Sequence, residues 1–141
     1  MNKTVSCFFV LLVLCVTLPA GAFAYNYISP EQVKQNLAAQ SAMSLIDIQV
    51  KDEFTQHHIQ GAVATYAYPV KSAADRAKLD VSVATLKNNQ DSAVIICPRG
   101  AGGAKRAYDY LVESGIPENR LFILSKGQGG WPFPELLAPA Q

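Results

Sequence analysis

Short apolar runs alternate with amphipathic stretches along this chain. The apolar runs are rich in β-branched residues and predict strands over about 43–48, 93–96 and 119–124, with a further short strand ending near Ala64. Helical spacing of apolar positions predicts helices over about 29–40, 71–79, 81–87 and 104–113, and a turn or short helix over 52–57. The connections between these elements are short.

Strands that alternate with helices indicate a small α/β domain with a mainly parallel central sheet and helices on both faces. The segment 93–96 is the most apolar strand and is expected at the centre of that sheet. Sites in such sheets form at the carboxyl ends of strands, beside helix N-termini. Cys97 directly follows the central strand, and Asp47 lies at or near the end of another.

Cys97 is followed by a glycine-rich, basic loop and then by a helical pattern. Free backbone N–H groups in such a loop and at the helix N-terminus stabilise an anion, and so favour the nucleophilic thiolate. The residues expected to surround the thiol are Arg99, Gly100, Ala101, Gly102, Gly103, Lys105 and Arg106. Arg99 is the candidate for contact with an anionic substrate, and only one of Lys105 and Arg106 can face the site. Asp47 is expected to support it by accepting backbone N–H bonds.

The first 24 residues have the pattern of a signal peptide. Lys3 precedes an apolar stretch over 6–18, and Ala22-Phe23-Ala24 has the small-x-small pattern of a cleavage site. Cleavage after Ala24 would leave one domain, 25–141, in the periplasm or outside the cell, with no attachment to a membrane. An uncleaved anchor and a lipid-modified Cys15 are the alternatives.

Charge and cysteine content restrict the chemistry further. The full chain has a net charge of +1, and removal of Lys3 leaves equal numbers of basic and acidic side chains, which gives no indication of a nucleic-acid partner. Cys7 and Cys15 belong to the predicted signal peptide, so Cys97 is the one cysteine of the remaining domain. A dithiol oxidoreductase is therefore disfavoured. His57 and His58 have no further ligand at useful spacing, so no metal site is expected.

Four segments, in order, make the chain similar to a single-domain rhodanese, a family of sulfurtransferases. They are 45–49 followed by Glu53-Phe54, then 58–62, then 95–100, and finally Leu124 with 127–131. The resemblance implies that Cys97 accepts sulfur from a small anionic donor such as thiosulfate, becomes a persulfide, and passes the sulfur to cyanide or a thiol. It implies no cofactor, and the sequence identifies no protein partner.

Two positions depart from the family pattern. Gln49 stands where the first signature usually carries arginine, so bracing of the site by ion pairing is expected to be weaker. Gly102 stands where the loop often carries arginine, and the helical pattern suggests a loop one residue longer than usual.

Two other functions remain open. One is a non-catalytic carrier or sensor of sulfur, selenium or a thiophilic metal that uses the same thiol. The other is a cysteine phosphatase, which is disfavoured because related phosphatases place arginine six residues after the cysteine, where this chain has Gly103.

Overall fold

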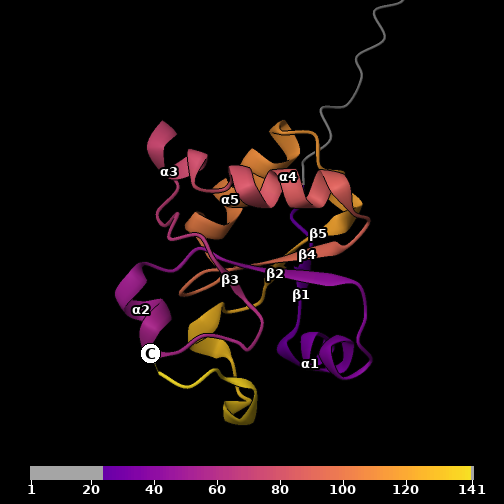
Figure 1. Ribbon diagram of the computed structural model, residues 1–141, viewed down its shortest axis with the longest axis vertical. Coiled ribbons are helices and arrows are strands. Elements are labelled where there is room, and N and C mark those ends of the chain that lie inside the picture. The colour runs from indigo at the N-terminus through magenta and orange to yellow at the C-terminus, as the bar shows by residue number, and fades with distance from the viewer. Residues whose placement is uncertain (1–23, 141) are drawn as a thin grey trace, which may run out of the picture.

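A five-stranded parallel sheet organises the chain, as the computed structural model shows in Figure 1. The structure describes residues 24–140. The strands are β1 (Tyr27–Ile28), β2 (Met43–Asp47), β3 (Val63–Ala64), β4 (Ser92–Ile96) and β5 (Leu121–Leu124). Their spatial order is β1-β5-β4-β2-β3, which confirms β4 as the central strand. The predicted signal peptide lies outside the described residues apart from Ala24, and its cleavage remains a prediction.

Helices cover both faces of this sheet, as the alternation predicted (Figure 1). The α-helices are α1 (Pro30–Ala38), α2 (Lys51–Gln56), α3 (Ala73–Ala77), α4 (Asp80–Asn88) and α5 (Gly102–Glu113). Short 3-10 turns are η1 (Glu118–Arg120), η2 (Gln128–Gly130) and η3 (Pro134–Leu136). Helix α1 lies on one face, α4 and α5 lie on the other, and α2 lies near one edge. Within the described residues, no helix is long and apolar enough to cross a membrane.

Strand β4 contributes to two separate apolar cores because its side chains alternate between the faces of the sheet. Ile95 and Cys97 belong to the core beneath α4 and α5, whereas Val94 and Ile96 belong to the core on the α1 side. All four side chains are buried. Burial on both sides explains why this segment is apolar throughout rather than alternating.

The start of α1 follows from local sequence. Ser29 Oγ accepts the backbone N–H of Gln32 at 3.2 Å, and Gln32 Oε1 accepts the backbone N–H of Ser29 at 3.1 Å. Pro30 occupies the first turn, where its missing N–H has no cost. This reciprocal capping box fixes where the helix begins, as the sequence pattern predicted.

Most predicted elements lie within two residues of their expected bounds, and one strand was missed. Strand β1 was not predicted, because two residues are too few to show a period. Strand β5 begins at Leu121 rather than at 119, since Arg120 donates its backbone N–H to Pro117 O at 3.0 Å in the η1 turn. Helix α5 begins at Gly102 rather than at 104, and Lys105 donates its backbone N–H to Ala101 O at 3.2 Å. The glycines at this point concealed the first helical turn.

Candidate active site

The sulfur of Cys97 lies where the central strand meets the N-terminus of α5. The residue directly follows β4, is 2% exposed, and is not in a disulfide. Its Sγ accepts a hydrogen bond from the backbone N–H of Gly100, with a donor–acceptor distance of 3.0 Å. A hydrogen bond of this kind stabilises negative charge on sulfur. One backbone N–H just before the start of α5 therefore points at the Cys97 sulfur.

The loop that joins Cys97 to α5 is Pro98–Ala101, two residues shorter than the expected helix start at 104 implied. Gly100 makes this short connection possible because its φ of 65° is in the left-handed region. A Cβ atom at Gly100 would lie 2.7 Å from Leu124 O and 2.8 Å from Lys126 N. The loop therefore packs directly against the backbone of the segment that follows β5.

The backbone N–H groups of that segment hold the cysteine loop by binding its carbonyl oxygens. Gln128 donates its backbone N–H to Cys97 O at 2.8 Å, and Gly129 donates to Pro98 O at 3.0 Å. Gly127 is packed against the same loop, and a Cβ atom there would overlap Cys97 O. The glycines of this segment thus allow its backbone to lie close to the backbone of the cysteine loop. The Gln128 side chain is 3% exposed, and neither of its polar atoms has a hydrogen-bond partner among the residues described.

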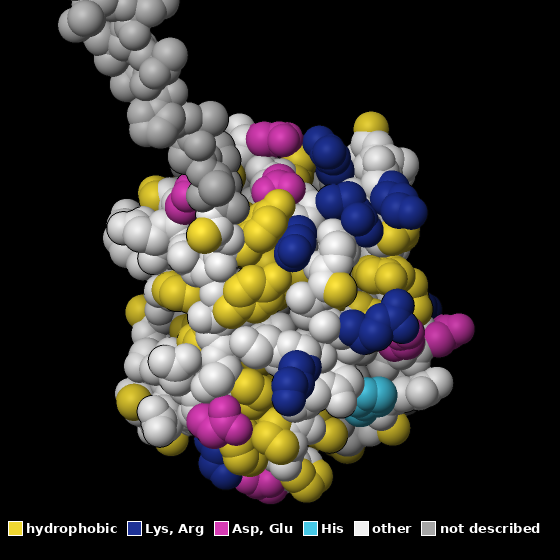
Figure 2. Space-filling model, turned by 180° about the vertical axis from the view of Figure 1, so that it is seen from behind, with side chains coloured by type: hydrophobic (Ala, Val, Ile, Leu, Met, Phe, Trp, Pro, Cys, Tyr) yellow, Lys and Arg dark blue, Asp and Glu magenta, His cyan; other side chains and the backbone are white. Residues whose placement is uncertain are grey.

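The three basic residues predicted near the thiol have different environments. Arg99 is exposed on the loop. Arg106 donates from Nε and Nη2 to Pro69 O at 2.9 and 2.8 Å, and its Nη1 lies beside Gly102 at the start of α5. Lys105 Nζ lies 5.2 Å from the ring centroid of Tyr25. Lys and Arg side chains gather on the upper right of the face in Figure 2.

Tyr68 is a neighbour of the site that the sequence pattern did not reveal. A Cβ atom at Gly103 would lie 2.8 Å from the Tyr68 ring, and its next neighbour would be Ile48 at 3.5 Å. Tyr68 also packs against the same core cluster as Cys97, and its backbone N–H donates to Ile48 O at 2.8 Å. The small residue at 103 therefore admits an aromatic ring over the first turn of α5.

Asp47 lies beside this region at the end of β2, with Ile96 as its register partner in β4. Its Oδ1 accepts the backbone N–H of Gln49 at 2.8 Å, and its Oδ2 accepts Gln49 Nε2 at 3.0 Å. Burial raises the pKa of the Asp47 carboxyl from 3.8 to about 6, although the bonds from Gln49 lower it. His58 follows α2, its Nδ1 lies 2.8 Å from Phe54 O, and its ring stacks on that of Phe54.

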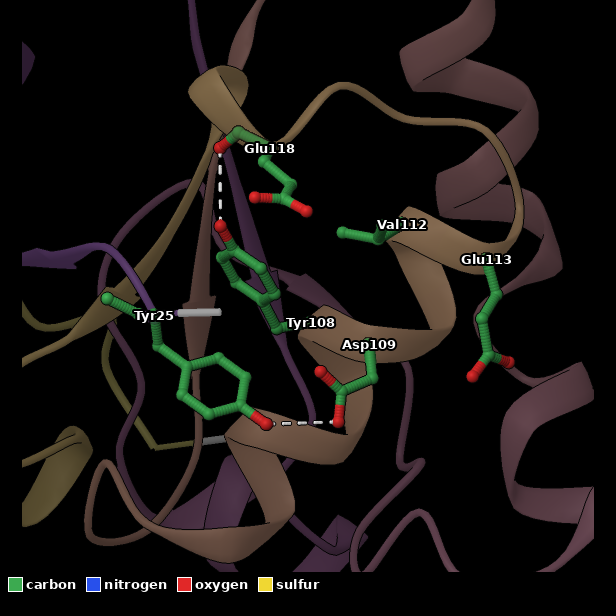
Figure 3. Close-up of a pocket in the computed structure, with 7 residues that line it drawn as sticks. Tyr25, Tyr108, Asp109, Val112, Glu113 and Glu118 are labelled. Atoms are coloured by element: carbon green, nitrogen blue, oxygen red, sulfur yellow. Dashed lines mark hydrogen bonds between the residues drawn. The ribbon is translucent and has the colours of Figure 1, made fainter. Parts of the chain in front are cut away.

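A separate cavity of about 260 Å³ lies elsewhere on the molecule, between Tyr25, the C-terminal half of α5 and η1 (Figure 3). Tyr25 donates its hydroxyl to Asp109 Oδ2 at 3.1 Å, and Tyr108 donates to Glu118 O at 3.3 Å. Its lining also includes Glu113 and no cysteine. Carboxylates repel an anionic sulfur donor, so this cavity does not compete with the Cys97 region for that chemistry.

Of the predicted site residues, the structure brings Cys97, Gly100 and the start of α5 together around one sulfur. It places Asp47 one strand away, and it directs Lys105 toward Tyr25. No cluster of three or more metal-ligating side chains occurs within residues 24–140. The contributions of Tyr68, Gln128 and Pro69 depend on tertiary packing, and no local sequence signal identified them.

Residues 24–140 thus form a parallel α/β domain whose one cysteine is buried at the end of the central strand, beside the loop that opens α5. The family model of the Rhodanese-like domain matches residues 29–132. The chain therefore belongs to the rhodanese-like family, and its fold is the rhodanese fold. No curated protein matches the sequence.

Solved structures of the same fold include three proteins with different named activities. An As-Sb reductase from Leishmania major is 18% identical over 82% of this chain and 86% of its own, with a TM-score of 0.66. A yeast protein tyrosine phosphatase of the Rhodanese family is 14% identical over 83% and 94%, with a TM-score of 0.62. A thiosulfate sulfurtransferase from Pseudomonas aeruginosa is 21% identical over 83% of this chain but only 21% of its own, with a TM-score of 0.64. At these identities the likeness shows the fold alone.

Proposed function

We propose that this domain transfers sulfane sulfur from a small anionic donor to a thiophilic acceptor through a persulfide on Cys97. The observation that carries the proposal is the Gly100 N–H that donates to Cys97 Sγ at 3.0 Å at the start of α5. A thiolate stabilised by a backbone N–H needs no neighbouring base to act as a nucleophile. A thiosulfate sulfurtransferase among the structures of the same fold agrees with a small-molecule substrate.

The reaction needs two displacements. The Cys97 thiolate attacks the outer sulfur of a thiosulfate-like donor, a new S–S bond forms, and the donor's own S–S bond breaks so that sulfite leaves with the electron pair. Cyanide or a thiolate then attacks the outer sulfur of the persulfide, and the Cys97 thiolate leaves with the electrons of that bond. The amide cradle stabilises the anionic sulfur before and after each displacement.

Positive charge near the loop supports an anionic donor. Arg99 is exposed directly beside the amide cradle, and Arg106 Nη1 lies near the first turn of α5. The unpaired N–H groups of that turn add a partial positive charge of their own. Together these groups raise the local concentration of a small anion.

A phosphatase function has less support than sulfur transfer. Hydrolysis of a phosphate ester by a cysteine needs a guanidinium that grips the phosphate in two places. Gly103 occupies the position six residues after Cys97, and the Tyr68 ring packs against it. Arg106, nine residues after Cys97, already donates twice to Pro69 O.

Location is a second part of the proposal. The signal-peptide pattern of the first 24 residues supports export, with the domain acting in the periplasm or outside the cell. A lone thiol in such a compartment is exposed to oxidants. The burial of Cys97 limits that exposure, because only 2% of the residue contacts solvent.

The decisive experiment measures the sulfur itself. Residues 25–141 are incubated with thiosulfate, and intact mass is recorded before cyanide is added and thiocyanate is assayed. We expect a mass increase of one sulfur, its loss on addition of cyanide, and repeated turnover.

The Cys97→Ser variant is the control and should neither load sulfur nor form thiocyanate. Loading without turnover would favour the carrier function. Failure to load, together with release of phosphate from an aryl phosphate, would overturn the sulfurtransferase proposal.

A further inference from the structure

An aromatic side chain lies over the first helical turn after the cysteine loop. The segment that joins β3 to α3 carries Tyr68 (Figure 1). Its ring fills the space that a side chain at Gly103 would need, because Cδ2 and Cε2 are 2.8 Å from the position of a Cβ atom there. Ile48 Cδ1 lies 3.5 Å from the same position. The Tyr68 ring, Ile48 and the first turn of α5 therefore meet at one point.

That point lies on the same side of the sheet as the Cys97 side chain. Ile48 donates its backbone N–H to Ile96 O at 2.9 Å, directly before Cys97, and its carbonyl accepts the N–H of Tyr68 at 2.8 Å. These three chain segments thus run side by side at the carboxyl end of the sheet. Ile48 and Cys97 belong to the core beneath α4 and α5, and the Tyr68 ring packs against that core. The ring consequently lies on the face of the sheet that carries the sulfur.

The backbone around Tyr68 has a conformation that its residues do not favour. Tyr66 and Val70 have φ angles of 54° and 59°, in the left-handed region, which is costly for a β-branched side chain such as that of Val70. Ala67 and Val70 are buried, so the chain is anchored in the core on both sides of Tyr68. Strained backbone of this kind persists where surrounding contacts maintain it, and it is concentrated at functional sites.

Two basic side chains fix the same segment. Arg106 donates from Nε and Nη2 to Pro69 O at 2.9 and 2.8 Å, so α5 itself holds the residue next to Tyr68. Lys78 Nζ donates to Tyr66 O at 3.0 Å on the other side. The hydroxyl of Tyr68 forms no hydrogen bond within residues 24–140, and the side chain is partly exposed. These contacts therefore position the aromatic ring rather than its hydroxyl group.

The Cys97 sulfur is nearly covered in this arrangement. Cys97 is buried, yet any donor has to reach its Sγ before a displacement can occur. On the loop side the contacts come from backbone, with the Gly100 N–H on the sulfur and Gly127 packed against Cys97 O. On the α5 side Gly103 has no side chain, and the Tyr68 ring takes that space. The Tyr68 ring thus limits the room for a reagent on the helix side.

We propose that the Tyr68 ring is a wall of the sulfur site that restricts Cys97 to compact reagents. Such a wall admits a small donor such as thiosulfate and excludes a donor whose sulfonyl group carries an aryl ring. The inference about donors rests on the proposed function. The inference about access does not, because every reagent that forms a bond with the Cys97 sulfur has to fit beside the same ring.

Alkylation by two neutral reagents of different size tests access. Residues 25–141 contain one cysteine, so intact mass reports the reaction of Cys97. Iodoacetamide is small, whereas N-phenylmaleimide carries an aryl ring. Tyr68→Ala should raise the rate constant for N-phenylmaleimide about 10-fold more than that for iodoacetamide, the size of discrimination that a confined site achieves between ligands of different bulk.

Control variants separate the wall from a general loosening of the core. Tyr68→Phe keeps the ring and should keep the wild-type ratio of the two rate constants. Tyr110→Ala removes a ring that packs against the same core from α5, where its hydroxyl donates to Asp80 Oδ1, and it should also keep that ratio. Urea unfolding shows whether each variant folds, and Tyr68→Leu replaces Tyr68→Ala if the latter does not. Equal changes for both reagents in the variant without the ring would overturn the proposal.

Sulfur loading distinguishes this inference from the proposed function. With benzenethiosulfonate as donor, the Cys97 thiolate attacks the outer sulfur, the S–S bond of the donor breaks, and benzenesulfinate leaves with the electron pair. Tyr68→Ala should shift the ratio of loading rate constants about 10-fold toward benzenethiosulfonate and away from thiosulfate. Loading with an unchanged ratio would overturn the wall and leave sulfur transfer intact. A size effect in alkylation without loading from either donor would overturn sulfur transfer and support the wall.

Discussion

Three basic side chains follow Cys97 within nine residues, and their surroundings separate their roles. Arg106 is tied to Pro69 O, and Lys105 lies over an aromatic ring. Arg99 is exposed and forms no side-chain hydrogen bond or ion pair within the described part of the chain. It is therefore the residue whose charge is most available to an incoming anion.

Replacement of Arg99 by alanine tests this at the scale of one side chain. We expect Arg99→Ala to reduce the rate constant for sulfur loading from thiosulfate by about 2- to 5-fold, the size of one exposed charge contact of up to about 1 kcal/mol. Loading from a neutral persulfide donor should change less. Both rates are followed by intact mass.

Lys87→Ala is the matched control, because Lys87 is exposed in the last turn of α4 and its substitution also removes one positive charge. An equal loss with anionic and neutral donors in Arg99→Ala would contradict an anion contact.

Two loops, not one, build the sulfur cradle. The loop 98–101 presents the Gly100 N–H to the sulfur, and the segment after β5 holds that loop through Gln128 and Gly129. Gly127 lies between them with φ 60° and ψ −159°, a conformation open almost only to glycine. The site is thus a contact between elements far apart in the sequence.

The interlocked loops predict a large effect of Gly127→Ala. Left-handed backbone costs an alanine about 1–2 kcal/mol. A Cβ atom at 127 would also overlap Cys97 O and approach Gly100 N at 2.5 Å, and overpacking of this kind adds about 1–3 kcal/mol. We expect a total loss of about 2–5 kcal/mol in the free energy of unfolding, together with slower sulfur loading.

Gly61→Ala isolates the conformational part of that loss. Gly61 also has a left-handed φ, of 80°, but no atom lies within 4 Å of the position of its Cβ. It should lose only about 1–2 kcal/mol and keep the loading rate of the wild type. Equal losses in the two variants would show that the contact with Cys97 O has no energetic weight.

The sequence located most helices and strands correctly, but it located their first and last residues less accurately. The capping box of Ser29 and the apolar run of β4 are local signals, so α1 and the central strand could be predicted. The first turn of α5 could not be, because glycine disfavours a helix in isolation and is needed at 103 only when Tyr68 is present.

The whole chain combines the domain at residues 24–140 with an N-terminal segment whose sequence has the pattern of a signal peptide. The described residues carry both apolar cores and the sulfur site, whereas residues 1–24 carry the export pattern. Ala24 and Tyr25 stand at the border between them. Processing at this border would separate the two parts without loss of a strand or helix of the described domain.

We expect the protein to be shortened when the full chain is expressed in a bacterium with signal peptidase. Its intact mass in the periplasmic fraction should correspond to residues 25–141, since small residues at 22 and 24 favour cleavage after Ala24. Ala24→Tyr should block the cut and keep the longer chain with the membrane. Ala20→Tyr, outside the small-x-small pattern, is the control. A full-length product for the wild type would contradict cleavage.

The sequence by itself determined the alternation of strands and helices, the central position of β4, and the choice of Cys97 as the candidate nucleophile, because these depend on local periodicity and on residue chemistry. Only the tertiary structure decided which amide faces the sulfur and where each arginine binds. Only it decided that the Tyr68 ring fills the space beside Gly103. These features arise where Gly127, Tyr68 and the end of β2 meet the Cys97 loop. Contacts between distant segments leave no period in the sequence.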